Sequence, residues 1–468
     1  MIGSGFLREL NWNITPRQAM MAWHVDVPML ALVSGGDSDA FDRWTILSPR
    51  TDTTRIDARV GKPKDLMQFI RDLAPARAPA FIDGGRVRLP FAGGWIGFIG
   101  YECGAMFEPR GITLKRPSSD WPDAVLCHVP RALVYSHKHR RWFEVGDPDA
   151  AEVASLVHPK QGARRGWWAI DGDHLRPIDV EGNFERMVAR AVEYVHAGDI
   201  FQTNITQPFR ATIRGCARHF ALDALTTTAS RYGAYLELDE SRSLLSFSPE
   251  LFLDLDGGTR RVTTRPMKGT RPDPADAHEL MASEKDTAEL HMIVDLMRND
   301  IGRVCEIGSV RVDKARTLEN HPTVLQTVAE VSGTLAQQYD FADLFAACFP
   351  PGSVTGAPKV RAMQIIDELE SVDRGPYCGA IGLASSCGSA LFSVAIRTAQ
   401  LTRTAQIAGN VHCPADPESW TIDYHAGCGI VAESDPATEN LECIAKTRIL
   451  RVALAADCSS PTTVAPRA

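Results

Sequence analysis

Residues 421–434, TIDYHAGCGIVAES, carry the strongest indication of the fold, and we interpret them as a glycine-rich strand. The segments SLLSFSPELFLDL, RVTTRPMKG and ALFSVAIRTAQL have the same strand-like character, and a long helical pattern runs from Ala275 to Val304. The helical patterns stand outside these strands, and no strand–helix–strand repeat joins them. The sequence therefore predicts an α+β fold of mainly antiparallel β-sheets, packed as a sandwich with flanking helices.

Two regions and a tail follow from the pattern along the chain. The first residues are strand-like and rich in turns, and we expect a mostly β region at 1–165. A helix with one apolar face comes next and ends before Gly198, and it opens a second region that we place at 181–452. The segment 455–468 is small, polar and proline-bearing, so we expect it to be disordered. The apolar face of the helix consists of Phe184, Met187, Val188, Ala191, Val192 and Val195.

The composition is that of an enzyme-sized globular protein. Of 468 residues, 44% are hydrophobic and 23% are charged, which excludes disordered and fibrous classes. The net charge of -8 provides no general attraction for nucleic acid. No apolar run of about 18 residues occurs, so we expect no membrane span. Eleven cysteines are scattered without a C-x-x-C pair, which favours reduced thiols in the cytoplasm over disulfides or a zinc site.

Lys268 stands in the segment Thr263–Pro272, TTRPMKGTRP, two residues after a proline and directly before a glycine. No helical period surrounds it. A lysine in such a turn is either a solvated tip or an amine that a stiff turn holds for attack on a substrate or for binding an anion. The local sequence leaves both interpretations open.

Three glutamates occupy predicted helices. Glu289 would lie at the edge of an apolar stripe, and Glu439 and Glu442 are three residues apart on one helix face. Lys446 follows Glu442 by four residues, so a surface ion pair is the competing interpretation for that helix.

Two further segments have the chemistry of an anion site. A helical period begins at Pro358, so the free N–H groups of this turn, together with Lys359, would bind a carboxylate or a phosphate. Arg397 could pair with a carboxylate through two hydrogen bonds, and the glycines of HAGCGIV would let a ligand approach the backbone. Packing or surface charge explains the glycines and Arg397 equally well, and a structural loop is the alternative for the turn at Pro358. Together with the glutamates they suggest a small acidic substrate bridged by a divalent ion, and oxygen ligands favour Mg²⁺.

A series of motifs resembles the chorismate-utilising family, which includes aminodeoxychorismate synthase component I, anthranilate synthase component I, and the isochorismate and salicylate synthases. The stretch PFAGGWIGFIGYECGAMFE extends the resemblance into the amino-terminal region. The other motifs follow the order of the family from Glu181 to about Val452: GDIFQTNITQ, SFSPE, RPMKGTRP, AELHMIVDLMRNDIGRV, FPPGSVTGAPKVRAM, YCGAIG, AIRT and GCGIVAESDPATENLE.

The resemblance implies roles for individual residues. Glu289 and Glu442 match the Mg²⁺ ligands of the family, with Glu439 close by, and the metal would hold the ring carboxylate of chorismate. The positions that match the surroundings of the substrate are Asn204, Thr270, Gly352, Ser353, Lys359, Tyr377, Arg397, Gly427 and Gly429.

Two positions separate the reactions of the family. Where isochorismate and salicylate synthases have a lysine that activates water, this chain has Gln202, so water addition is disfavoured. Where anthranilate synthases normally have alanine, this chain has Lys268, as the aminodeoxychorismate-forming members do. The resemblance therefore implies amination of chorismate at C4, with anthranilate synthase component I as the alternative. Gln326 stands where the family often has a histidine, and its role stays open.

The implied route is covalent. The Lys268 amine adds at C2 as the C4 hydroxyl departs, and ammonia then enters at C4 and expels the lysine, so one difficult step becomes two easier ones. Glu250, in SFSPE, would protonate the hydroxyl and later take a proton from ammonia. No cysteine lies in a G-x-C-x-G turn, so we expect a separate glutaminase subunit to supply the ammonia. The segment Pro28–Ser48 resembles the part of the family that binds tryptophan.

Overall fold

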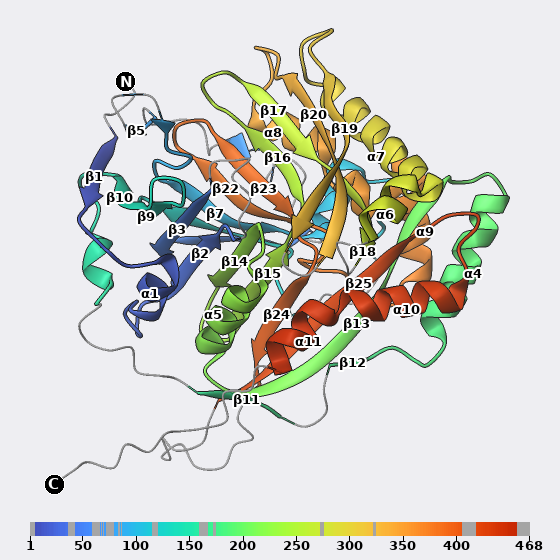
Figure 1. Cartoon of the computed structure of the whole chain (residues 1–468), viewed down its shortest axis with the longest axis horizontal. Helices are drawn as coiled ribbons and strands as arrows, with labels where there is room; N and C mark the ends of the chain where they lie inside the picture. The colour runs from blue at the N-terminus through green and yellow to red at the C-terminus, as the bar shows by residue number, and fades with distance from the viewer. Residues whose placement is uncertain are drawn as a thin grey trace.

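Two large sheets form the body of the protein (Figure 1). The strands that pair in them do so antiparallel, so the predicted α+β class with mainly antiparallel sheets and flanking helices is confirmed. The predicted disordered tail lies outside the described residues except for residue 455. The computed structural model describes residues 5–35, 43–58, 66, 68, 70–71, 79–82, 85, 87–114, 120–158, 167–171, 175–271, 276–321, 324–404 and 418–455.

The larger sheet combines strands from both halves of the chain. Two short strands, β12 (Arg176–Pro177) and β21 (Gly356–Ala357), also pair with its strand β13. In spatial order the sheet contains β1 (Phe6–Leu10), β10 (Arg141–Gly146), β9 (Arg131–Ser136), β3 (Trp44–Pro49), β2 (Met29–Val33), β14 (Tyr232–Glu237), β15 (Arg242–Ser248), β24 (Thr398–Arg403), β25 (Ser419–Ile430), β13 (Gln202–Gly215) and β11 (Trp168–Ile170).

The smaller sheet is also shared between the two halves. Its order is β18 (Met267–Arg271), β20 (Val324–Thr334), β17 (Arg261–Arg265), β16 (Leu251–Leu255), β23 (Ala390–Val394), β22 (Ala380–Ser385), β7 (Gly94–Ile99), β8 (Ala124–Val129) and β4 (Thr53–Ile56), with β19 (Arg311–His321) paired to β20. The two regions that we predicted at 1–165 and 181–452 therefore meet within both sheets, through the pairs β2–β14 and β7–β22.

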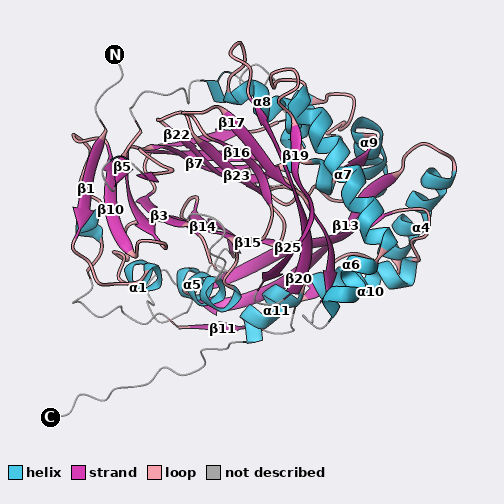
Figure 2. Cartoon of the chain, turned by 45° about the horizontal axis from the view of Figure 1, so that its top comes forward, coloured by secondary structure: helices cyan, strands magenta, loops and turns pink. Residues whose placement is uncertain are grey.

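Helices flank the sheets, and Figure 2 shows α4, α7, α9 and α10 gathered at one end of the molecule. A short 3₁₀ turn, η2 (Tyr101–Cys103), follows β7, and another, η5 (Gly352–Val354), precedes α9. The helices are α1 (Pro16–Met21), α3 (Gly104–Phe107), α4 (Asn183–His196), α5 (Ala217–Thr228), α6 (Ala277–Ala282), α7 (Glu284–Gly302), α8 (Phe341–Cys348), α9 (Lys359–Leu369), α10 (Pro436–Lys446) and α11 (Arg448–Ala455).

Local sequence explains where two of these helices begin and end. Helix α4 buries much of its predicted apolar face and stops before Gly198, whose φ of 80° suits glycine. The long helix predicted from Ala275 to Val304 is instead two helices. Ser283 separates them, because it ends α6 and its hydroxyl accepts the N–H of Asp286 as the N-cap of α7. This break leaves α7 to carry Glu289.

Thiols and hydropathy give two further observations. All nine cysteines within the described parts of the chain are free thiols, as their scattered spacing predicts. Among the described residues, no helix combines the length and the apolar character that a bilayer span requires.

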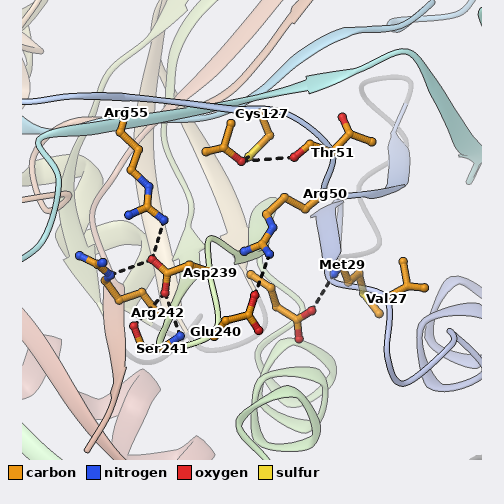
Figure 3. A network of polar contacts seen from close by, with 12 residues as sticks. Val27, Met29, Arg50, Thr51, Arg55, Cys127, Asp239, Glu240, Ser241 and Arg242 are labelled. Carbon is orange, nitrogen blue, oxygen red and sulfur yellow. Dashed lines mark hydrogen bonds and ion pairs between the residues drawn. The ribbon is translucent and has the colours of Figure 1, made fainter. Parts of the chain in front are cut away.

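A network of polar contacts joins the two sheets beside the β14–β15 turn (Figure 3). Asp239 in this turn accepts hydrogen bonds from Arg55 of β4, at 2.8 Å, and from Arg242 of β15, at 2.9 Å. Its neighbour Glu240 pairs with Arg50 at 3.4 Å. The smaller sheet, through Arg55, is thus bonded to the turn of the larger one.

Glu237, just before that turn, is much more buried than Glu240. Its carboxylate accepts the backbone N–H of Met29 at 2.6 Å, the Tyr235 hydroxyl at 3.0 Å, and two hydrogen bonds from Arg218, at 2.7 and 2.8 Å. Arg218 also donates to the carbonyls of His24 and Val27. One carboxylate therefore connects β2, β14 and α5.

We predict that Glu237→Ala lowers the free energy of unfolding by about 3 kcal/mol, because it leaves the Arg218 guanidinium, whose side chain is only 13% exposed, without its counter-charge. Urea unfolding followed by tryptophan fluorescence measures the change. The control is Glu240→Ala, whose side chain is 89% exposed and whose ion pair contributes about 0–1 kcal/mol. Equal losses for the two variants would contradict this account of the network.

Candidate active site

Lys268 points inward from a kinked strand. The register of β18 against β20 shifts between Lys268 and Thr270, and Gly269 between them has a φ of 74°, which glycine adopts without strain. The Thr327 hydroxyl of β20 donates to the Lys268 carbonyl. Only 13% of the Lys268 side chain is exposed. Of the two interpretations left open by the sequence, the solvated tip is excluded.

Residues from three other elements, α7, β25 and β13, surround the Lys268 amine. Its Nζ lies 3.9 Å from Oε2 of Glu289 on α7. Gly429 of β25 lies on the other side, since a Cβ built there would be 3.1 Å from Nζ. The same Cβ would be 2.2 Å from Nε2 of Gln202 on β13, so only glycine leaves room for both side chains. The structure thus places Lys268, Glu289, Gln202 and Gly429 together.

Glu250, between β15 and β16, is a buried carboxyl group beside them. Burial raises its pKa to about 7, against the opposing effects of a hydrogen bond with Ser353 and the positive charges of Lys268 and Arg397. A carboxyl group with this pKa exchanges a proton near neutral pH, as a general acid or base requires.

Arg397 supplies an unused positive charge near Glu250. Its backbone has a φ of 53°, in the left-handed region, and its side chain is half-buried. Within the described parts of the chain, no group forms a hydrogen bond or ion pair with the guanidinium. Burial lowers its pKa, and the nearby Tyr424 and Glu250 oppose that effect. An arginine in this state is suited to bind a substrate carboxylate through two hydrogen bonds.

Tyr377 and Asn204 line the same interior face. The Tyr377 ring stacks on His425 with the ring centroids 5.5 Å apart. Asn204 pairs with Gly429 across the β13–β25 ladder, and its buried Nδ2 has no hydrogen-bond partner in the described chain. A buried amide without a partner is costly, so this donor is available for a ligand.

The three predicted metal ligands are close but not equally buried. Glu439 is buried and accepts a hydrogen bond from the Ser434 hydroxyl at 2.7 Å, whereas Glu442 is more exposed and pairs with Lys446 at 2.8 Å. Ligand atoms of Glu439, Glu442 and Cys428 lie within 4.8 Å of one another. Glu289 is not in that group, although its pKa is raised by burial and, to a smaller degree, by the charge of Glu442.

These carboxylates fit a magnesium ion. Oxygen is the donor that Mg²⁺ prefers, and a divalent cation would relieve the repulsion between Glu289 and Glu442. The Cys428 thiol is a soft donor, and it already donates to the Glu439 carbonyl at 3.4 Å. Lys285 lies 3.9 Å from Glu439 and adds positive charge to the metal-free cluster.

The structure places Lys359 elsewhere than predicted. Its amine donates to Oδ2 of Asp300 at 2.6 Å and to the Cys348 carbonyl at 2.8 Å, and its side chain is buried. Since Asp300 already neutralises the charge, Lys359 joins α9 to α7 and α8 rather than forming the predicted anion site.

Other predicted substrate positions have a packing role. A Cβ at Gly352 would be 2.6 Å from Leu296, and one at Gly427 would be 2.4 Å from the Ile205 carbonyl, so both glycines permit close approach of neighbouring elements. The backbone of Thr270 pairs with Gln326 in the β18–β20 ladder, but the Thr270 side chain lies outside the described residues.

Two functional candidates escaped the sequence analysis. Lys446 is not simply a surface partner of Glu442, because its Nζ also donates to the Gly427 carbonyl at 2.8 Å. Arg374 is buried and bonded to Glu370, four residues before it, and to the Asn204 carbonyl. The spacing of Glu370 and Arg374 is visible in the sequence, but it predicts only a helical ion pair.

Comparison with known proteins agrees with this geometry. Over 432 residues the chain is 36% identical to aminodeoxychorismate synthase component 1 of Escherichia coli, covering 88% of this chain and 86% of that one. Over 395 residues it is 33% identical to anthranilate synthase component 1 of Saccharolobus solfataricus, covering 82% and 84%. The crystal structure of anthranilate synthase component I from Streptococcus pneumoniae superposes with a TM-score of 0.72 at 27% identity, covering 89% of this chain and 93% of that one.

The profile of one family spans most of the chain. It is described as chorismate binding enzyme and matches residues 44–451, which include every residue of the candidate site. The match and the relatives above together make this chain a member of the chorismate binding enzyme family and a chorismate-utilising enzyme.

Proposed function

We propose that the protein aminates chorismate at C4 to give 4-amino-4-deoxychorismate, with Mg²⁺ as cofactor and ammonia from a glutamine amidotransferase subunit. The observation that carries the proposal is Lys268, an inward-pointing amine beside Glu289 and Gly429. Such an amine can both occupy the position next to C2 and act as a nucleophile. The E. coli relative is named aminodeoxychorismate synthase component 1, which supports the same reaction.

In the first step the neutral Lys268 amine forms a bond to C2 of chorismate. The two ring double bonds shift from C1=C2 and C5=C6 to C1=C6 and C4=C5, the C4–O bond breaks, and protonated Glu250 gives its proton to the departing hydroxyl, which leaves as water. The Lys268 Nζ lies 3.9 Å from the Glu289 carboxylate. An ammonium ion is no nucleophile, so any proton on this nitrogen must pass to solvent before the amine attacks.

In the second step ammonia forms a bond to C4, and both double bonds shift back to C5=C6 and C1=C2. The C2–N bond to Lys268 breaks, and the Glu250 carboxylate takes a proton from the new C4 ammonium. Glu250 is thereby returned to its acidic form, and the sum of the two steps is chorismate and ammonia giving aminodeoxychorismate and water. Its pKa of about 7 allows it to serve in both directions.

Three carboxylates would hold the metal, namely those of Glu289, Glu439 and Glu442. When bound, Mg²⁺ would neutralise the ring carboxylate of chorismate and fix its position. The unpaired Arg397 guanidinium is the group that we assign to the other carboxylate of the substrate, with Tyr377 and Asn204 beside it.

We place glutamine hydrolysis on a separate subunit, because no cysteine of the sequence lies in a glutaminase-type turn. The relatives named as component 1 support a protein of more than one subunit. We locate the reaction in the cytoplasm. The tryptophan site predicted in Pro28–Ser48 falls partly on residues 36–42, outside the described residues, and stays a prediction.

The second candidate is anthranilate synthase component I. It is favoured by relatives of that name at similar identity, 33% and 35%, and by the superposition with the Streptococcus pneumoniae structure. Lys268 is the feature that speaks against it, since an amine at this place blocks attack of ammonia at C2.

Product analysis separates the two candidates. With chorismate, ammonium and Mg²⁺, we expect the purified chain to form aminodeoxychorismate, and with glutamine in place of ammonium we expect no turnover until a glutaminase subunit is added. Chromatography against both standards identifies the product. Anthranilate as the main product of the wild-type chain would overturn the proposed function.

Lys268→Ala should lose most C4 amination, because the route through the adduct is gone, and some ortho-aminated product is expected from the opened C2 position. Lys268→Arg should fail as well, since a guanidinium stays protonated. Mass spectrometry of wild-type protein with chorismate and Mg²⁺, without ammonia, should find a ring adduct on the Lys268 peptide. Wild-type rates for Lys268→Ala together with no trapped adduct would exclude covalent catalysis.

The pKa of Glu250 predicts the pH dependence. Burial raises this pKa to about 7, so the protonated acid is present below that pH and is lost as the pH rises through it. We therefore expect kcat/KM for chorismate to fall above about pH 7. Glu250→Gln should lose about 100-fold or more in rate. Glu306→Gln, an exposed glutamate after α7, serves as the control and should keep both the rate and the profile.

Glu289→Gln tests the metal assignment. We expect it to raise the Mg²⁺ concentration for half-maximal rate and to lower turnover by about 100-fold, with thermal stability nearly unchanged, because it removes a charged ligand rather than a core side chain. Glu284→Gln, an exposed position in the first turn of the same helix, is the matched control. A Mg²⁺ dependence identical in both variants would remove Glu289 from the ligand set.

A further inference from the structure

Arg374 is a buried guanidinium that donates four hydrogen bonds. Only 1% of the residue is exposed. Its Nε and Nη2 donate to the two carboxylate oxygens of Glu370, at 2.9 and 2.6 Å. Its Nη1 donates to the Val354 carbonyl at 2.9 Å, and Nη2 also donates to the Asn204 carbonyl at 2.6 Å. The guanidinium therefore holds the backbone of two separate elements.

Both elements carry groups that we assign to the reaction. Val354 belongs to η5, and the residue before it, Ser353, forms the hydrogen bond with Glu250. Asn204 belongs to β13, and its buried Nδ2 faces the site without a partner in the described chain. A displacement of either carbonyl would move the adjoining polar group.

We call the hydrogen bonds of Arg374 to Glu370, Val354 and Asn204 the clamp. Residues of the amino-terminal region hold this clamp in place. Glu102 of η2 accepts the backbone N–H of Arg374 at 2.8 Å and that of Gly375 at 2.9 Å. The ring of Tyr101 lies against the guanidinium at 4.5 Å. On the other side, Glu370 accepts both the N–H and the hydroxyl of Thr206. Arg374 cannot shift without breaking several of these contacts at once.

We infer that Arg374 is a positioning residue, which sets the place of the Ser353 hydroxyl beside Glu250 and of the Asn204 amide. The inference rests on the proposed function, because the role of Glu250 as proton donor comes from it. A buried ion pair adds little to stability compared with apolar residues of similar volume, so stability alone does not account for the clamp.

The groups that face Glu250 make the consequence measurable. They are the Ser353 hydroxyl from η5, the Lys268 amine from β18 and the Arg397 guanidinium. The hydrogen bond with Ser353 stabilises the carboxylate, so losing it raises the pKa of Glu250. The protonated form then persists to higher pH. The alkaline limb of the pH profile, where kcat/KM declines, therefore moves to higher pH.

The test is the pH profile of kcat/KM for Arg374→Lys, measured as chorismate consumption with ammonium and Mg²⁺. Lysine keeps the charge but cannot hold two carbonyls and a carboxylate in one plane. We expect the alkaline limb to move by about one unit to higher pH, because a shift of that size corresponds to the free energy of one hydrogen bond to a charged group. Ser353→Ala, which removes that bond directly, should give the same shift.

The matched control is Arg260→Lys. Arg260 also clamps backbone carbonyls, those of Leu335, Ala336 and Tyr339, but it lies in the turn before β17, at the opposite end of that strand from the Lys268 segment. This variant should keep the wild-type limb. Thermal unfolding and circular dichroism establish that each variant is folded before its profile is measured.

If Arg374→Lys folds and its alkaline limb coincides with that of the wild type, the inference is overturned, whatever the rate of the variant. If that variant does not fold, Glu102→Gln decides, since an amide cannot accept both backbone N–H groups and the clamp is loosened. A smaller upward shift supports the inference, and an unchanged limb overturns it. The assay follows chorismate consumption and not the product. A wild-type product other than aminodeoxychorismate would therefore contradict the proposed function, but the alkaline sides of the pH profiles could still be compared between variants.

Discussion

The pairing of β13 with β25 is the constraint on which the rest of the site depends. It runs from Thr203 opposite Ile430 to Arg214 opposite Ser419 and places Gly429 across from Asn204 and Gly427 across from Thr206. Antiparallel neighbours direct their side chains to the same face, so two glycines here leave that face open. The space is taken by the Gln202 amide and the Lys268 amine, which reach it from β13 and from the smaller sheet.

Burial in that space determines the chemistry of its charged groups. Removing a carboxyl from water favours its neutral form, which explains the raised pKa of Glu250, and opposite charges nearby limit the effect. Arg397 is the reverse case, a charge that burial destabilises and that has no counter-ion in the described chain. An anionic substrate would supply the missing counter-ion. An unpaired buried charge is costly, so binding of an anionic ligand beside Arg397 would stabilise the site.

The groups around Lys268 were named through the family resemblance, and the structure places Glu289, Gln202 and Gly429 beside its amine. Sequence patterns were sufficient for the class of fold, because strand character and helical period are local features. They failed where a partner lies far along the chain. Lys359 looks like an anion ligand until Asp300, fifty-nine residues away, is found to neutralise it, and nothing near Arg374 indicates that it bonds the carbonyl of Asn204. The division at Ser283 was missed because the helical period continues across it, while its capping hydroxyl depends on backbone geometry.

The relatives named aminodeoxychorismate synthase component 1 and anthranilate synthase component 1 are similarly close to this chain, and the proposed site explains why overall similarity separates them poorly. On the proposed function, both reactions need the same carboxylate contacts, the same acid at Glu250 and the same metal ligands, so most of the site is common to them. The difference lies in whether an amine occupies the space beside C2. That space is bounded by the Gly269 bulge, which orients Lys268, and by Gly429, which admits it. On the proposed function, the direction of amination thus depends on one side chain and on the two glycines that give it room.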